Sequence, residues 1–210
     1  MLKIWLSTCP DDFAGEYDQI EDMFHRGLSR LILYKRGPGY NHMATDYTYE
    51  RWILSLPEEF KDKVWVRGTP DLAEQLDVRG CVCEARSLVG EVPESWKRIS
   101  TVAFCRTLDE LQNLPQWLSG ALVGPVFPSE FTPEPAKFLT KETSLEELSA
   151  TLAPVAAKIP LIGWGGIDEE NVPNAKKLPL SGVSVLGGIW NYADPINAFI
   201  KFKRACDAAI

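Results

Sequence analysis

Two pairs of adjacent glycines are candidates for binding an anion. Gly165-Gly166 and Gly187-Gly188 each follow a short apolar run, at residues 160–163 and 182–186. Because glycine has no side chain to block a ligand, its backbone N–H can approach a phosphate group closely. Glycines are also common turn residues at strand ends, so each pair alone is weak evidence. Together, the two pairs predict a site for a phosphate ester.

Basic residues follow several apolar runs in the first half of the chain. They are Lys35, Arg36, Arg67, Arg86 and Arg106. The chain carries a net charge of −7, so this group is a local excess of positive charge. Arginine can bind an anion through two parallel hydrogen bonds. We expect these residues to line the substrate pocket and bind a second anionic group. Ion pairs at the outer rim, with neighbours such as Glu84, are the alternative.

Short β-like runs alternate along the chain with helix-favouring segments. The runs cover residues 3–6, 30–34, 63–66, 80–83, 99–104, 120–123, 160–163 and 182–186. The helical segments cover residues 17–28, 46–56, 70–76, 107–114, 144–158, 168–178 and 194–209, with a weak signal at 93–97. Strands that alternate with helices run parallel, and eight repeats in 210 residues predict an α/β fold, the (β/α)8 TIM barrel. An open doubly wound sheet is the alternative.

A barrel would bring the glycine pairs and the basic residues to the same end. The loops after the strands form its carboxyl-terminal face, where phosphate is frequently bound after strands seven and eight. No Gly/Ser-rich or Pro-rich linker divides the chain. We therefore predict one TIM-barrel domain over residues 1–210.

Composition argues against several classes of partner. The acidic charge disfavours nucleic acid. No apolar run is long enough to span a membrane, and the N-terminal segment lacks the features of a signal peptide. Five cysteines, an odd number, fit reduced thiols. We expect a cytoplasmic protein with neither nucleic acid nor membrane as partner.

Three motifs in the second half of the chain carry a family resemblance. They are GPVFPS at 124–129, GGIDEENV at 165–172 and SGVSVLGGIW at 181–190. In order and spacing they resemble the thiamin phosphate synthase (thiamine-phosphate pyrophosphorylase) family and its sister, the TenI-type thiazole tautomerases. The resemblance is specific over residues 120–209 and topological before them. It implies a (β/α)8 barrel of thiamin biosynthesis that binds a small phosphorylated metabolite, thiazole phosphate or a related ester.

The resemblance also implies roles for individual residues. The two glycine pairs would donate backbone N–H groups to the thiazole phosphate. Gly124, Pro125 and Ser129 would border the loop at the thiazole or diphosphate. Lys35 would correspond to the lysine that binds the pyrimidine diphosphate, which makes it a candidate catalytic residue, and Arg36 would add a second cation.

The residues expected for magnesium-dependent synthesis are replaced in this chain. The family's Asn-Asp pair after strand three falls on Arg67-Gly68, and its Asp after strand four falls near Ser87. We therefore predict no metal site, with magnesium as a cofactor only if the synthase reaction holds despite these replacements. The tautomerase histidine is replaced by Cys105, which is a candidate catalytic thiol if its pKa is lowered. A buried, inert Cys105 is the alternative, and the one we favour.

Three functions remain open from the sequence. The first is an enzyme of this superfamily, either a diphosphorylase-type transferase or a tautomerase. The second is a catalytically degenerate barrel that only binds a phosphate ligand, because the metal carboxylates are absent. The third is another phosphate-handling barrel enzyme, such as an isomerase or aldolase. Related barrels often self-associate, so a homo-oligomer is also open.

Overall fold

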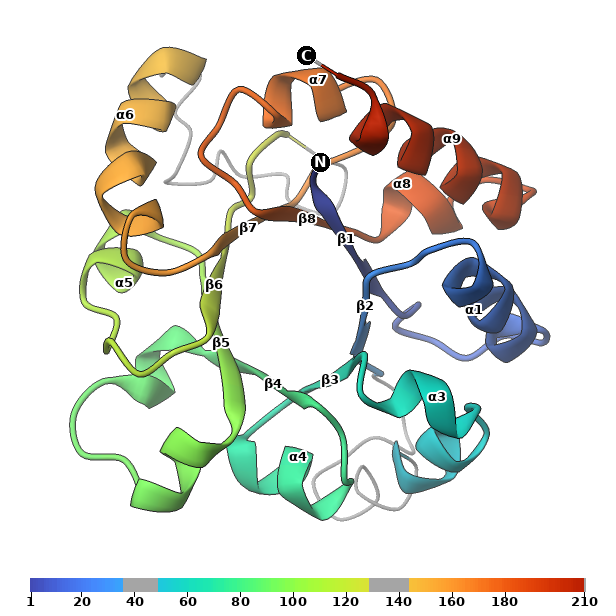
Figure 1. The fold of residues 1–210 in the computed structure, drawn as a ribbon, viewed down its shortest axis with the longest axis horizontal. Helices are drawn as coiled ribbons and strands as arrows, with labels where there is room; N and C mark the ends of the chain where they lie inside the picture. The colour runs from blue at the N-terminus through green and yellow to red at the C-terminus, as the bar shows by residue number, and fades with distance from the viewer. Residues whose placement is uncertain (36–48, 129–143, 210) are drawn as a thin grey trace.

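The eight strands form one closed parallel barrel (Figure 1). The structure is a computed structural model, and it describes residues 1–35, 49–128 and 144–209. The strands are β1 Lys3–Ser7, β2 Arg30–Leu33, β3 Val64–Arg67, β4 Gly80–Glu84, β5 Ser100–Cys105, β6 Gly120–Val123, β7 Leu161–Trp164 and β8 Gly182–Val185. Each pairs with the next in the chain, and β8 pairs with β1. The predicted (β/α)8 barrel is confirmed, and every strand begins and ends within one residue of its predicted bounds.

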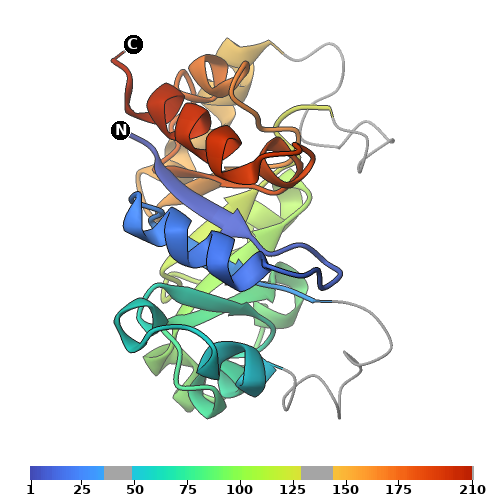
Figure 2. The same cartoon turned by 90° about the vertical axis from the view of Figure 1, so that its right-hand side faces the viewer.

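Helices surround the barrel, and all strands point to the end opposite the start of the chain (Figures 1 and 2). The helices are α1 Glu16–His25, a segment at 49–54, α3 Glu58–Lys61, α4 Pro70–Gln75, α5 Leu108–Gln112, α6 Leu145–Ala156, α7 Val172–Ala175, α8 Gly187–Trp190 and α9 Pro195–Asp207. After β4 the chain forms only 3-10 turns, η1 Ala85–Leu88 and η2 Glu94–Arg98. This agrees with the weak helical signal there. Within the described residues, no helix is both long and apolar enough to cross a membrane.

Local sequence explains where the better-defined helices begin. At α6, the Ser144 hydroxyl accepts a hydrogen bond from the Glu147 amide, and the Glu147 side chain accepts one from the Ser144 amide. This capping box satisfies two amides that the helix itself cannot bond. At α4, Thr69 caps the helix and Pro70 occupies its first turn, where no N–H is needed. The predicted helix at 46–56 begins outside the described residues.

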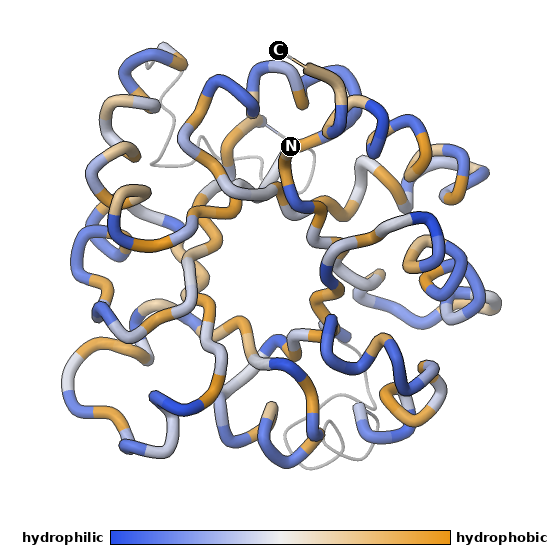
Figure 3. The backbone as a smooth tube through the Cα atoms, viewed as in Figure 1, coloured by the Kyte–Doolittle hydropathy of each residue, from blue (hydrophilic) through white to orange (hydrophobic). Residues whose placement is uncertain are grey.

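The barrel wall separates two hydrophobic clusters. The larger one lies between the strands and the surrounding helices. The smaller one fills the barrel interior and consists of Trp5, Ile32, Trp65, Val82, Val102, Leu122 and Ile162. Hydrophobic residues dominate the strands, whereas hydrophilic stretches lie mainly at the periphery (Figure 3). Because strand residues alternate between the two sides, the residue two places beyond an interior residue again faces inward. The interior cluster therefore determines which side chains reach the carboxyl-terminal face.

Glycine at position 80 permits the close packing of the interior. The rings of Trp5 and Trp65 lie 4.9 Å apart between centroids. A Cβ atom at Gly80 would be 1.9 Å from the Ser100 carbonyl oxygen and 2.9 Å from Trp65 Nε1. The first contact is with backbone of the neighbouring strand, which cannot move without disturbing the β4–β5 pairing.

We predict that Gly80→Ala lowers the free energy of unfolding by about 3 kcal/mol or more, because overpacking against backbone is not easily relieved. The measurement is the midpoint of urea denaturation. Gly68→Ala is the matched control, since its Cβ would meet only the flexible end of Leu72, at 2.8 Å. Equal midpoints for the two variants would contradict the prediction.

The division of the chain into one domain over residues 1–210 stays a prediction.

Candidate functional site

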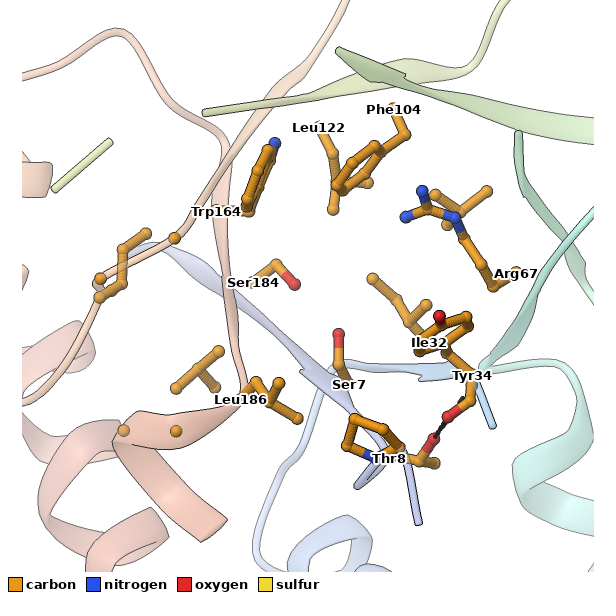
Figure 4. Close-up of a pocket in the computed structure, with 18 of the residues that line it drawn as sticks. Ser7, Thr8, Ile32, Tyr34, Arg67, Phe104, Leu122, Trp164, Ser184 and Leu186 are labelled. Atoms are coloured by element: carbon orange, nitrogen blue, oxygen red, sulfur yellow. Dashed lines mark hydrogen bonds between the residues drawn. The ribbon is translucent and has the colours of Figure 1, made fainter. Parts of the chain in front are cut away.

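A cavity of about 820 Å³ opens at the carboxyl ends of the strands (Figure 4). This is within the size range of small-molecule sites. The strands and the residues just after them contribute Ser7, Ile32, Tyr34, Arg67, Val82, Glu84, Phe104, Leu122, Trp164 and Ser184. The loops after β7 and β8 contribute both predicted glycine pairs.

The cavity has an apolar floor and an aromatic wall. Ile32, Val82 and Leu122 belong to the interior cluster and form the floor. Phe104 and Trp164 stack with ring centroids 4.6 Å apart and planes inclined by 25°. The Trp164 Nε1–H donates a hydrogen bond to the Cys105 carbonyl at 3.2 Å, which fixes the orientation of the indole. This wall can pack against a planar ring.

The first glycine pair is required by close contact with a neighbouring loop. Gly165 and Gly166 have φ values of 87° and 62°, in the left-handed region that favours glycine. A Cβ at Gly165 would be 2.3 Å from Pro125 Cβ, and one at Gly166 would be 2.4 Å from the Phe127 carbonyl oxygen. Gly124 and Pro125 are buried and are not among the lining residues of the cavity. They lie behind the glycine loop rather than at its open side.

Two of the predicted arginines meet at one carboxylate. Arg67 and Arg106 both donate hydrogen bonds to Glu84, and the Arg106 Nη2–Glu84 Oε1 distance is 3.2 Å. The guanidinium carbons of Arg67 and Arg106 lie 3.6 and 4.6 Å from the centroid of the Phe104 ring. Burial by itself would raise the pKa of Glu84, but the two arginines outweigh it and hold that pKa below its ordinary value. The pairing with Glu84 expected as the alternative is present, and it lies in the cavity wall.

The other basic residues lie elsewhere. The ammonium of Lys35 is fully buried, donates to Glu16 and lies 3.0 Å from an oxygen of Asp12. Its backbone N–H donates to the Tyr49 hydroxyl at 3.0 Å, and Lys35 does not line the cavity. Arg86 is exposed on η1, also outside the lining. Arg36 and Ser129 lie outside the described residues.

Cys105 faces the shell between the barrel and the helices. It belongs to the outer cluster, whereas its neighbour Phe104 points into the cavity. Burial raises the pKa of the Cys105 thiol to about 12, and nearby Glu110 and Glu84 act in the same direction. The thiol is therefore protonated at neutral pH. This placement supports the interpretation of Cys105 as an inert, buried residue.

The described residues do not fit a magnesium ion. The carboxylates among the lining residues are Glu84 and Asp168. Glu84 is bound to two arginines, and Asp168 Oδ1 accepts hydrogen bonds from the amides of Glu170 and Asn171, each at 3.0 Å. Over 1–35, 49–128 and 144–209 there is no group of three or more His, Cys, Asp or Glu side chains suited to a metal.

Sequence reasoning missed several side chains that line the cavity. Phe104, Trp164, Ser7, Ser184 and Tyr34 were not assigned to it. The available signal was the period of two along each strand, because Ser7, Tyr34, Phe104 and Trp164 each lie two positions beyond a residue of the interior cluster.

Fold and cavity together define a (β/α)8 barrel with a cavity of small-molecule size at its carboxyl-terminal face. No protein-family profile matches the chain. A thiamine-phosphate synthase of Bacillus licheniformis is 23% identical over 99% of this chain and 92% of its own length. A thiamine-phosphate synthase of Caldivirga maquilingensis is 27% identical over 89% of this chain and 88% of its own length. The structure of thiamine phosphate pyrophosphorylase from Bacteroides thetaiotaomicron superposes with a TM-score of 0.75, at 23% identity, over 99% of this chain and 98% of that one.

These similarities support placing the chain as a divergent member of the thiamin phosphate synthase superfamily. The resemblance stated from its three motifs is thereby confirmed at the level of the superfamily. In the cavity of this chain, arginines, aromatic rings and serines occupy the strand ends.

We predict that Glu84→Gln lowers the free energy of unfolding at pH 7 by about 1 kcal/mol, because two arginines lose their anionic partner. The pKa of Glu84 is lowered by folding, so its contribution is complete above the unfolded pKa of about 4.3 and is lost as pH falls through the folded value. Urea denaturation from pH 7 to pH 3 should show the difference between wild type and variant shrinking below about pH 4. The control is Glu58→Gln, at a side chain that is 84% exposed. A pH-independent difference at position 84 would refute the assignment.

Proposed function

We propose that this protein acts in thiamin biosynthesis and binds thiazole phosphate or a related phosphate ester at the carboxyl-terminal face of its barrel. The observation that carries the proposal is that all four glycines of the two pairs line one cavity. The full-length similarity to proteins named thiamine-phosphate synthase supports the same conclusion.

In this proposal the phosphate lies against the loops after β7 and β8. Gly187 and Gly188 open α8, and the first amides of a helix have no partner within it. These amides, together with those of Gly165 and Gly166, are the proposed donors to the phosphate oxygens. Gly124 and Pro125 support the first glycine loop from behind.

The arginines are the proposed site for a second anionic group. Arg67 and Arg106 line the cavity, and Glu84 neutralises one of their two charges. Arg106 is about half exposed, with 49% of its side chain accessible, so part of its guanidinium faces the open cavity. A diphosphate or carboxylate could take bidentate hydrogen bonds there.

The second candidate function is a barrel that binds this ligand but does not catalyse its conversion. The specific observation in its favour is that two candidate groups for proton transfer, Glu84 and Cys105, are engaged in ion pairs or face away from the cavity. Glu84 is held between two arginines, and Cys105 faces the outer shell. If the protein forms thiamin phosphate from thiazole phosphate and aminopyrimidine diphosphate, it is an enzyme and not only a binding protein.

Calorimetric titration with thiazole phosphate should show binding of equal affinity with and without magnesium. The reason is that the carboxylates in the described cavity wall are already occupied by arginines or backbone amides. Thiamin phosphate and pyrophosphate serve as comparison ligands. Magnesium-dependent binding of pyrophosphate alongside thiazole phosphate would contradict metal independence, and the absence of all binding would reject the proposed function.

Arg106→Ala should weaken pyrophosphate binding by about tenfold, the lower end of the range for hydrogen bonds to charged groups, because the residue is half exposed. Arg86→Ala is the matched control, since it removes an exposed arginine that follows the neighbouring strand β4 and does not line the cavity. The measurement is again calorimetry, at low ionic strength. If both variants bind pyrophosphate like the wild type, the arginines are not an anion site.

A further inference from the structure

Two serine hydroxyls in the cavity have no partner among the described residues. The residues classed as buried and polar are Thr8, Glu16, Lys35, Thr101 and Ser184. Thr8, Glu16, Lys35 and Thr101 each make side-chain hydrogen bonds. Neither the Ser184 hydroxyl nor that of Ser7 bonds to any described group, although both residues line the cavity. Figure 4 shows both hydroxyls pointing into the open centre.

Strand register explains why these hydroxyls reach the centre. Ser184 on β8 is in register with Trp5 on β1 and with Trp164 on β7. Trp5 faces the barrel interior, so Ser7, two residues further along β1, faces the same way. The two serines therefore lie on adjacent strands, diagonal to each other and offset by two residues along the strand.

The side of the cavity opposite β8 and β1 is aromatic and cationic, because Arg67 lies over the Phe104 ring there. Trp164, which is in register with Ser184 on the neighbouring strand, stacks on Phe104 and extends this aromatic surface to the serines. In Figure 4 the serine hydroxyls face Phe104 and Arg67 across the open space, and Trp164 lies beside Ser184. A flat ring placed between them would meet an aromatic surface on one side and hydroxyl groups at its edge.

We propose that Ser7 and Ser184 form a recognition site for the polar edge of a planar heteroaromatic ring, whose phosphate is bound by the glycine pairs. The proposal rests on the proposed function and adds the residues that select the ring. A hydroxyl can donate to a ring nitrogen or accept from an N–H, so it fits a heterocycle better than a hydrocarbon ring. Ser184 precedes Gly187 by only three residues, which places the ring site next to the phosphate site on one segment.

Stability and binding should respond differently to loss of these hydroxyls. A hydroxyl that bonds to no protein group contributes no intramolecular hydrogen bond to the folded state. Ser7→Ala and Ser184→Ala should therefore leave the melting temperature unchanged or slightly raised. Each should weaken binding of a heterocyclic ligand by about threefold to tenfold, the range for one neutral hydrogen bond.

The test compares two phosphate esters by calorimetry. One is the phosphate of 4-methyl-5-(2-hydroxyethyl)thiazole, and the other is 2-phenylethyl phosphate, which keeps a flat ring and the phosphate but has no ring heteroatom. We expect the wild type to prefer the thiazole ester, and the two serine variants to lose that preference while binding the phenyl ester normally. Ser100→Ala is the matched control, because its hydroxyl bonds to Ser119 at the other end of the barrel.

A third probe separates this inference from the proposed function. It is the thiazole alcohol without phosphate, followed by chemical-shift changes in NMR spectra of the same variants. Equal wild-type affinity for both esters would overturn the ring site while leaving the phosphate site intact. Binding of the alcohol that weakens in the serine variants would support the ring site even if neither ester bound through its phosphate. No binding of any probe would overturn both.

Discussion

The alternation of side chains along eight short strands is the constraint on which the rest of this structure depends. In a closed barrel each strand places every second residue inside, where space is limited by the opposite wall. Trp5 and Trp65 pack inside the barrel beneath the cavity, and the absence of a side chain at Gly80 leaves room for them. The next inward residues on most strands, among them Ser7, Arg67, Phe104 and Trp164, form the wall of the cavity. The alternation of side chains along the strands therefore determines both how the core packs and which residues line the cavity.

Both ion pairing and burial determine where the charged side chains of this site lie. Arg67 and Arg106 could repel each other over the Phe104 ring, but Glu84 lies between them and remains ionised. The result is a group with one net positive charge, fixed in place by hydrogen bonds and by a ring. A second group, around Lys35, is buried outside the cavity and connects the end of β2 to the start of α1. In each group, basic residues at or just after a strand pair with a glutamate, but only the Arg67–Arg106–Glu84 group lines the cavity.

Superfamily membership and local chemistry are separate features of this chain. The chain is similar to proteins named thiamine-phosphate synthase over nearly its whole length. Its strand ends carry an aromatic stack, paired arginines and two hydroxyls that bond to no described residue. A barrel can vary the side chains at its strand ends because these contribute less to its core than the strand interiors do.

The sequence by itself determined the fold class, the position of each strand and the location of the glycine loops at the cavity. These follow from local signals, namely apolar runs, helix caps and glycine pairs. It did not determine which nearby residues face the cavity, because a shift of one position along a strand moves a side chain to the other side of the wall. Tertiary structure decided that Phe104 lines the site and Cys105 does not, and that Arg67 and Arg106 share Glu84. Such pairings join residues from different strands, so only the closed barrel brings them together.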